Sequence, residues 1–151
     1  MKYLLITAHT LLTLWWRLTR PILFGVRILL IQDDQVMLVK HVYQPEWYLP
    51  GGGLKRYESL EQAVRREARE EVGAELGAVQ LFDLDTSVNH GITLHLAVFL
   101  CTEFNLGGPS DAEIAEKRFF PLDALPANTA QSNRSKIEKY RMGYEASIIA
   151  D

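Results

Sequence analysis

The residues most suited to chemistry are three glutamates that follow a run of three glycines at residues 51–53. In an α-helix, at about 100° per residue, Glu67, Glu70 and Glu71 lie within one turn of each other. Like charges at these spacings repel by a few tenths of a kcal/mol even when they are exposed. A hard dication such as Mg²⁺ or Mn²⁺, which prefers oxygen ligands, offsets that cost. The spacing therefore predicts a divalent-metal site and, with it, a phosphate-processing enzyme.

The helix that must carry these glutamates has recognisable ends. Ser59 is a predicted N-cap, and Gly73 is a predicted C-terminal stop. The apolar residues between them share one broad arc that should face the core: Leu60, Ala63, Val64, Ala68 and Val72. Glu67 and Glu71 project into this arc, and Glu70 lies at its edge. Because unpaired buried carboxylates are costly, this placement favours a bound cation.

A solvated acidic face is the alternative interpretation of this helix. Its arginines are close enough in sequence to neutralise the glutamates: Arg65, Arg66 and Arg69. The upstream glycines, the pairing of Glu58 with Arg66 and the position of the glutamates within the apolar arc favour the metal site instead.

Residues 52–74 resemble the signature of the Nudix hydrolase family, a fixed spacing of glycine, glutamate, Arg-Glu, Glu-Glu and glycine. The matching residues are, in order, Gly52, Glu58, Arg66, Glu67, Glu70, Glu71 and Gly73. Ala68 and Ala74 are small residues at the two aliphatic positions, which affects packing rather than chemistry. The lead-in at residues 47–53 is also typical of the family, and the resemblance extends over about residues 22–143.

This resemblance implies hydrolysis of a diphosphate linkage in a nucleoside diphosphate joined to another group. Mg²⁺, or alternatively Mn²⁺, would polarise the phosphoryl oxygens and help to activate the attacking water. Glu67, Glu70 and Glu71 are the implied metal ligands, and one of them also serves partly as the base. Glu58 and Arg66 are expected to form an ion pair that fixes the loop against the helix. A plain surface salt bridge is the alternative for that pair.

Other candidate site residues lie outside the helix. The glycines at residues 51–53 can adopt conformations closed to other residues, so Gly51 is a candidate backbone ligand of the metal; a simple tight turn is the alternative. In this family a further carboxylate often comes from a downstream loop, and Glu113 is favoured over Glu116 because it precedes Ile114. A solvated loop is the alternative there. The candidates for substrate contacts are Arg27, Lys40, Arg56 and Trp47. Each cation could equally be a surface residue, and the indole could equally pack in the core.

The sequence does not select one substrate. Residues 89–92 lack the proline that marks ADP-ribose hydrolases and the tyrosine that marks dinucleoside polyphosphate hydrolases. ADP-ribose, a nucleoside triphosphate, as for MutT-type pyrophosphatases, and a sugar nucleotide all stay open. The alternative function is a non-catalytic nucleotide sensor, but sensors of this type often carry decayed signatures, whereas this signature keeps all its charged residues.

Composition narrows the class of protein. The chain has 151 residues, 48% of them hydrophobic, which suits one globular domain with a substantial core. The formal net charge of −3 gives no basic footprint for nucleic acid. Cys101 is the only cysteine, so no intrachain disulfide can form, and its apolar surroundings predict a small buried residue. These features lead us to expect a cytoplasmic protein that binds a small nucleotide.

Residues 1–20 form a separate segment, with a predicted amphipathic helix over residues 3–18. We expect this helix to pack against the domain or a partner subunit, and the family resemblance gives an expectation of a homodimer. The apolar run is shorter than the ~20 residues of a membrane span. No signal-peptide cleavage site follows it. Contact with a membrane surface is a weaker alternative, because the Trp-Trp-Arg cluster at residues 15–17 suits a headgroup boundary.

Residues 21–151 form the predicted catalytic domain. Strands are predicted over residues 24–32, 35–42, 47–49, 79–88, 92–104 and 117–120. Asp33 and Asp34 form the first hairpin turn, residues 105–110 form a loop, and residues 130–144 form a second helix. Strands on both sides of a central helix, with another helix at the end, predict an α/β fold with a mixed sheet between helical layers. The Nudix resemblance implies the same α/β/α sandwich.

Overall fold

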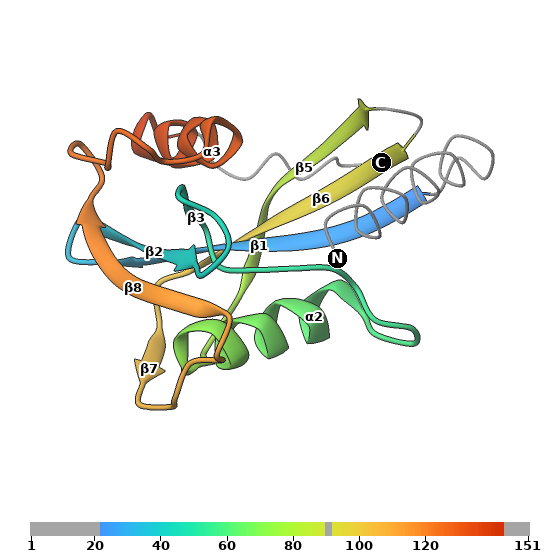
Figure 1. The fold of residues 1–151 in the computed structure, drawn as a ribbon, viewed down its shortest axis with the longest axis horizontal. Coiled ribbons are helices and arrows are strands. Elements are labelled where there is room, and N and C mark those ends of the chain that lie inside the picture. The colour runs from blue at the N-terminus through green and yellow to red at the C-terminus, as the bar shows by residue number, and fades with distance from the viewer. Residues whose placement is uncertain (1–21, 90–91, 144–151) are drawn as a thin grey trace, which may run out of the picture.

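Strand β1 (Ile22–Gln32) lies near the middle of a mixed sheet in the computed structural model, which describes residues 22–89 and 92–143 (Figure 1). Its apolar run is buried on both faces of the sheet, as is typical of a strand covered from two sides. Val26 and Ile28 pack on one side, and Leu29 and Ile31 pack on the other. This arrangement agrees with the predicted sheet between two helical layers.

The partners of β1 differ on its two sides. Strand β6 (Ile92–Cys101) runs parallel to it along most of its length, and β5 (Gln80–Asn89) pairs antiparallel with β6. On the other side, β2 (Gln35–His41) pairs with β1 only next to the hairpin turn. Beyond that point β2 pairs with β3 (Trp47–Tyr48) and β8 (Ile114–Pro121). The divergence of β2 from β1 leaves the side of β1 open to the glycine segment.

One helix covers each face of the sheet, as Figure 1 shows. Helix α2 (Leu60–Glu67) continues directly into a π-helix, η1 (Ala68–Val72), and packs on one face. Helix α3 (Gln131–Arg141) packs on the other through Ile137. Within the described ranges, no helix has the length and hydropathy of a membrane span.

The structure confirms the local signals that bound the first helix. Ser59 accepts a hydrogen bond from the backbone N–H of Gln62, whose side chain accepts one in return, forming a capping box. Gly73 ends η1 in the left-handed region, with a φ of 67°. The turn at Asp33 and Asp34 is also confirmed, with positive φ at both residues, as type I′ hairpins require.

Several boundaries differ from the prediction because partner strands decide where a strand ends. The strand predicted over residues 92–104 ends at Cys101, which is buried as predicted. The predicted loop begins as β7 (Phe104–Leu106), which pairs with the unpredicted β4 (Ala74–Leu76). Strand β8 begins at Ile114, three residues before the predicted start, because it pairs along β2. The helix predicted over residues 3–18 lies outside the described residues.

Candidate active site

The three glutamates lie where α2 passes into η1. Their exposure agrees with the helical arc: the side chains of Glu67 and Glu71 are 12% and 10% exposed, whereas that of Glu70 is 37% exposed. The π-helical turn was not predicted; such turns are rare and frequently occur at functional sites. It contains both Glu70 and Glu71.

Arg66 connects the glutamates to the preceding loop. Its Nε and Nη2 donate to the two carboxylate oxygens of Glu58 at 2.7 and 2.9 Å. Its Nη1 donates to Glu67 at 2.6 Å and to Glu70 at 3.0 Å, and Nη2 also reaches the carbonyl oxygen of Gly53. Hydrogen bonds from Arg66 and from a backbone N–H lower the pKa of Glu58 to about 2. The structure thus contains the expected ion pair and extends it to two of the candidate metal ligands.

The other two arginines of the helix turn away from the glutamates. Arg65 pairs with Glu61, and Arg69 pairs with Glu75 at 2.6 Å. Of these three arginines, Arg66 alone pairs with the candidate metal ligands, so the alternative of a neutralised acidic face depends on this residue. Within residues 22–89 and 92–143, no three acidic, histidine or cysteine side chains are already arranged around a common metal position. Binding a cation would require the carboxylates held by Arg66 to turn toward it.

Glu71 is the most buried of the three glutamates. Its Oε2 accepts a hydrogen bond of 2.8 Å from the backbone N–H of Gly51, and its Oε1 lies 3.8 Å from Nε2 of His41. Burial raises the pKa of Glu71 to about 7, although the Gly51 hydrogen bond and the charge of Arg27 lower it. His41, which the sequence analysis did not single out, has a buried Nδ1 that finds no hydrogen-bond partner among the described residues.

The glycine segment runs alongside β1 in the space that β2 leaves. The backbone N–H of Val26 donates to the carbonyl of Gly52 at 2.9 Å. Gly51 has a φ of 144°, and a side chain there would collide with the carbonyl of Val26. A Cβ on Gly52 would lie 2.5 Å from Oε1 of Glu67. The glycines are therefore required where the segment passes between β1 and the acidic helix.

Gly51 and Arg27 are joined by a hydrogen bond. The Arg27 guanidinium donates a hydrogen bond to the carbonyl oxygen of Gly51. That oxygen, the predicted backbone ligand, would have to exchange this partner for a metal. Burial lowers the pKa of Arg27, although the nearby glutamates raise it.

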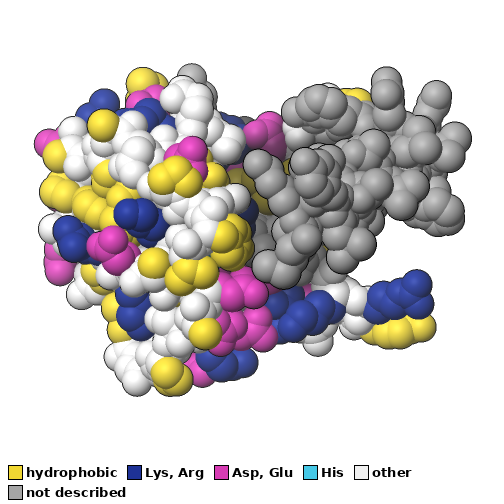
Figure 2. All heavy atoms as spheres, in the orientation of Figure 1, with side chains coloured by type: hydrophobic (Ala, Val, Ile, Leu, Met, Phe, Trp, Pro, Cys, Tyr) yellow, Lys and Arg dark blue, Asp and Glu magenta, His cyan; other side chains and the backbone are white. Residues whose placement is uncertain are grey.

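An acidic cavity of about 240 Å³ brings the helix and a distant loop together. Its lining residues are Lys55, Arg66, Glu67, Glu70, Glu71, Asp111, Glu113 and Ile114. Figure 2 shows acidic side chains gathered over α2 beside basic ones. Glu113 thus lies with the helix glutamates, whereas Glu116 pairs with Lys40 at 3.6 Å. Asp111 was missed; the signal for it was its place two residues before Glu113.

The donor set of this cavity fits a hard dication. Its acidic side chains offer only oxygen ligands, as Mg²⁺ and Mn²⁺ prefer. The lack of a side chain on Gly52 allows the Glu67 carboxylate to lie against the glycine segment. Glu67, Glu70 and Glu71 are the residues that would hold the ion.

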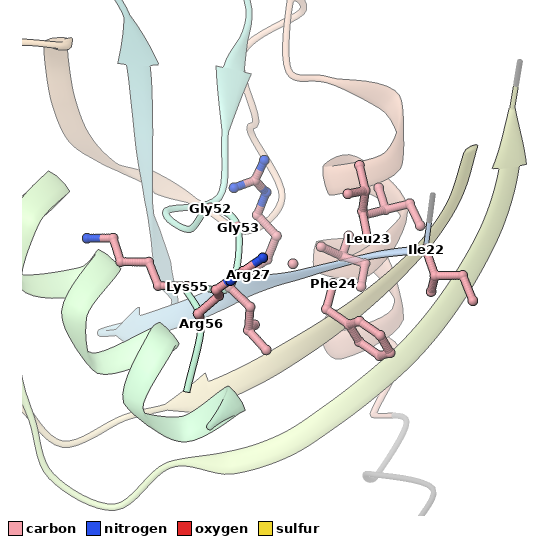
Figure 3. Close-up of a pocket in the computed structure, with 12 residues that line it drawn as sticks. Ile22, Leu23, Phe24, Arg27, Gly52, Gly53, Lys55 and Arg56 are labelled. Carbon is pink, nitrogen blue, oxygen red and sulfur yellow. The ribbon is translucent and has the colours of Figure 1, made fainter. Parts of the chain in front are cut away.

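The four candidate substrate contacts divide into two groups. Arg27 and Arg56 line a second cavity of about 500 Å³ (Figure 3). Lys40 and Trp47 line neither cavity. Trp47 is buried and packs edge-on against Phe120, with ring centroids 4.8 Å apart. An indole held in the core cannot stack on a base without opening the core, so the geometry supports core packing for Trp47.

Comparison with known proteins agrees with this geometry. Residues 22–140 match the family model described as the NUDIX domain. The chain is 33% identical over 112 residues to the NAD-capped RNA hydrolase NudC of Pseudomonas aeruginosa and 29% identical over 104 residues to Putative nudix hydrolase 1 of Caenorhabditis elegans. These alignments cover 69% and 66% of this chain but only 38% and 28% of the relatives, so the chain spans well under half of their length.

Solved structures extend the similarity to the whole fold. The MutT NUDIX hydrolase from Burkholderia pseudomallei superposes with a TM-score of 0.69 and 28% identity, covering 78% of this chain and 96% of that chain. The E. coli ORF135 protein shares the fold with a TM-score of 0.66 and 21% identity, covering 87% of this chain and 96% of its own. Because the family model covers most of the chain and its acidic helix and glycine segment meet at one cavity, the chain belongs to the NUDIX domain family.

Proposed function

We propose that this protein hydrolyses a diphosphate linkage in a small nucleoside diphosphate derivative and requires a divalent cation to do so. The acidic cavity is the observation that carries the proposal. It collects five carboxylates from the helix and from the loop before β8, and Arg66 is the cation fixed among them. A cluster of this kind suits a positively charged ion together with a polyanionic substrate.

The side chains divide into holding and orienting roles. Glu67, Glu70 and Glu71 would hold Mg²⁺, which supplies charge neutralisation at the phosphoryl oxygens and a more acidic bound water. Glu58 orients Arg66, and Arg66 sets the directions of the Glu67 and Glu70 carboxylates. Glu113, across the cavity, adds a further carboxylate that could bind a second ion or accept a proton.

The substrate class rests on the relatives as well as on the cavity. One is named as an NAD-capped RNA hydrolase, and another, the E. coli protein NudI, as a nucleoside triphosphatase; NudI is 42% identical over 53 residues, which cover 31% of this chain. Both names refer to a substrate that includes a nucleotide. We therefore include ADP-ribose, nucleoside triphosphates and sugar nucleotides among the candidate substrates.

A nucleotide screen tests the proposal. The purified protein is incubated with ADP-ribose, nucleoside triphosphates and sugar nucleotides in Mg²⁺ or Mn²⁺, and released phosphate and nucleoside monophosphate are measured. We expect turnover that EDTA abolishes and that Glu70→Gln lowers by about 100-fold or more. Glu103→Gln, an exposed carboxylate outside both cavities, is the matched control and should keep full activity. Nucleotide binding without turnover in any metal would favour the sensor alternative instead.

A further inference from the structure

The second cavity differs in chemistry from the acidic one. This apolar cleft, of about 500 Å³, lies between the start of β1, strand β6 and residues 52–56 (Figure 3). Its apolar wall includes Leu23, Phe24, Leu94 and Leu96. Its size and mainly apolar lining are those of a small-molecule site, which typically measures 300–1,000 Å³.

A glycine keeps the floor of the apolar cleft open. Leu23 and Gly25 of β1 pair in register with Leu94 and Leu96 of β6. A Cβ on Gly25 would lie 3.3 Å from both the Leu96 side chain and the carbonyl of Gly52. Any larger residue there would fill the space between the strands and the glycine segment, so the cleft depends on this position.

The polar part of the cleft is entirely cationic. Among the described residues, its charged lining side chains are Arg27, Lys55 and Arg56, and no acidic, amide or hydroxyl side chain lines it. Lys55 also lines the acidic cavity, where its Nζ lies 3.6 Å from Oε1 of Glu70. Lys55 is therefore shared by the two cavities, and it lies between the carboxylates proposed to bind the metal and the apolar wall.

We propose that the apolar cleft binds the nucleobase of the substrate by its flat faces, and that the protein therefore distinguishes poorly between bases. This inference rests on the proposed function and deepens it. A nucleotide would place its uncharged, flat base on the apolar wall and its anionic diphosphate beside the cationic side chains. Lys55 and Arg56 contact the phosphates as these pass from the cleft toward the acidic cavity.

The poor discrimination follows from the lining residues. A site that hydrogen-bonds a substrate group rejects analogues by 10⁴–10⁵-fold, whereas an apolar pocket discriminates by only 10–200-fold. Bases differ mainly in the donors and acceptors at their edges, and the lining side chains within residues 22–89 and 92–143 include no neutral hydrogen-bonding group to read them. Contact with an apolar or aromatic face is tolerant of sequence because every base has such a face.

The test compares ADP-, GDP-, CDP- and UDP-glucose as substrates and, by calorimetry, as ligands. For the wild-type protein we expect the four values of kcat/KM and the four Kd values to lie within about fivefold of each other. Leu23→Asp, at a 44% exposed position, puts a carboxylate on the apolar wall and should raise KM and Kd by about tenfold or more for all four, with kcat unchanged. Leu84→Asp is the matched control: it lies on β5, is 54% exposed and lines neither cavity.

A second pair of variants tests the cationic side chains of the cleft independently of the apolar wall. Arg56→Gln should weaken all four ligands equally, and Arg118→Gln, an exposed arginine on β8, should not. A base preference above about tenfold would overturn the inference. An unchanged KM and Kd in Leu23→Asp would overturn it too. So would a change in the sedimentation coefficient of this variant, which would assign the cleft to contact with a second copy of the chain. Equal binding of all four nucleotides without turnover would support the inference and exclude these four compounds as substrates. The proposed hydrolysis would then be decided by ADP-ribose and the nucleoside triphosphates in the nucleotide screen.

Discussion

At the scale of single residues, burial disfavours the charged form of Glu71. Its side chain is 10% exposed, its hydrogen bond comes from the neutral amide of Gly51, and His41 lies beyond hydrogen-bond distance at 3.8 Å. In the absence of a cation, its carboxylate gains a proton more readily than an exposed glutamate does. Metal binding and proton release are therefore coupled at this residue.

The stability of the metal-free protein should reveal this proton. Because the folded-state pKa of Glu71 is about 7 and the unfolded value is lower, its contribution to stability is fully present below about pH 4.3 and is lost as the pH rises through 7. Between those limits this residue should lower the free energy of unfolding of the wild-type protein by on the order of 1–3 kcal/mol, measured by urea unfolding in EDTA. We expect Glu71→Gln to abolish that decrease. Glu103→Gln should leave the slope unchanged; the same slope in both variants would contradict this account.

Arg66 performs the opposite task, because it neutralises Glu67 and Glu70 while no metal is bound. Its bonds to Glu58, Glu67 and Gly53 join the loop to the helix. We expect Arg66→Gln to lower the free energy of unfolding by about 2 kcal/mol and kcat/KM by about 10- to 100-fold.

Arg65→Gln is the control for Arg66. Arg65 pairs with Glu61 and donates to the backbone carbonyls of Leu76 and Gly77. The variant can therefore lose stability but should keep its metal affinity. Equal effects of the two substitutions on metal affinity, measured by calorimetry, would show that Arg66 has no special part in holding the ligands.

At the scale of elements, the end of η1 is tied to the loop that supplies Asp111 and Glu113. The backbone N–H groups of Gly107 and Gly108 donate to the carbonyl of Gly73, and that of Asp111 donates to the carbonyl of Glu70. These hydrogen bonds join the helix end to the loop and so connect the two walls of the acidic cavity.

Gly73→Ala tests that connection. The residue has a φ of 67°, and a Cβ there would collide with the backbone of Gly108. We expect a loss of about 1–3 kcal/mol in unfolding free energy and weaker Mg²⁺ binding, because the loop must shift. Gly107→Ala is the matched control, since a Cβ at that position meets nothing within 4 Å. A weaker Mg²⁺ affinity in the control alone would contradict the argument.

At the scale of the whole molecule, cation binding should stabilise the fold because the ligands belong to the native state. A ligand at 100 times its Kd adds about 2.7 kcal/mol, which corresponds to a rise in Tm of roughly 5–10 °C for a chain of this size. Calorimetric scans with and without Mg²⁺, at equal ionic strength, measure the shift. We expect Glu71→Gln to lose most of it. The same shift with Na⁺ alone would indicate charge screening rather than a specific site.

Short-range patterns in the sequence were enough to predict the acidic helix. Ser59 and Gly73 end it through hydrogen bonds to their near neighbours, and the helical period alone decides that Glu67 and Glu71 share the buried arc. The strands β1 and β2 and the turn between them are similarly readable, because an apolar run and a short polar turn act over a few residues.

Tertiary structure alone decided which distant residues meet. Glu113 reaches the glutamates because β8 pairs with β2, and the apolar cleft exists because β6 runs parallel to β1 beside the glycine segment. Trp47 of β3 is buried because it packs in one cluster with Ile137 of α3 and Phe120 of β8, although its local sequence suits a surface aromatic equally well. Strand order and helix packing join segments far apart in the chain, and no local spacing encodes them. The acidic helix could therefore be located from the sequence, whereas the shapes of the acidic cavity and the apolar cleft are decided by the fold.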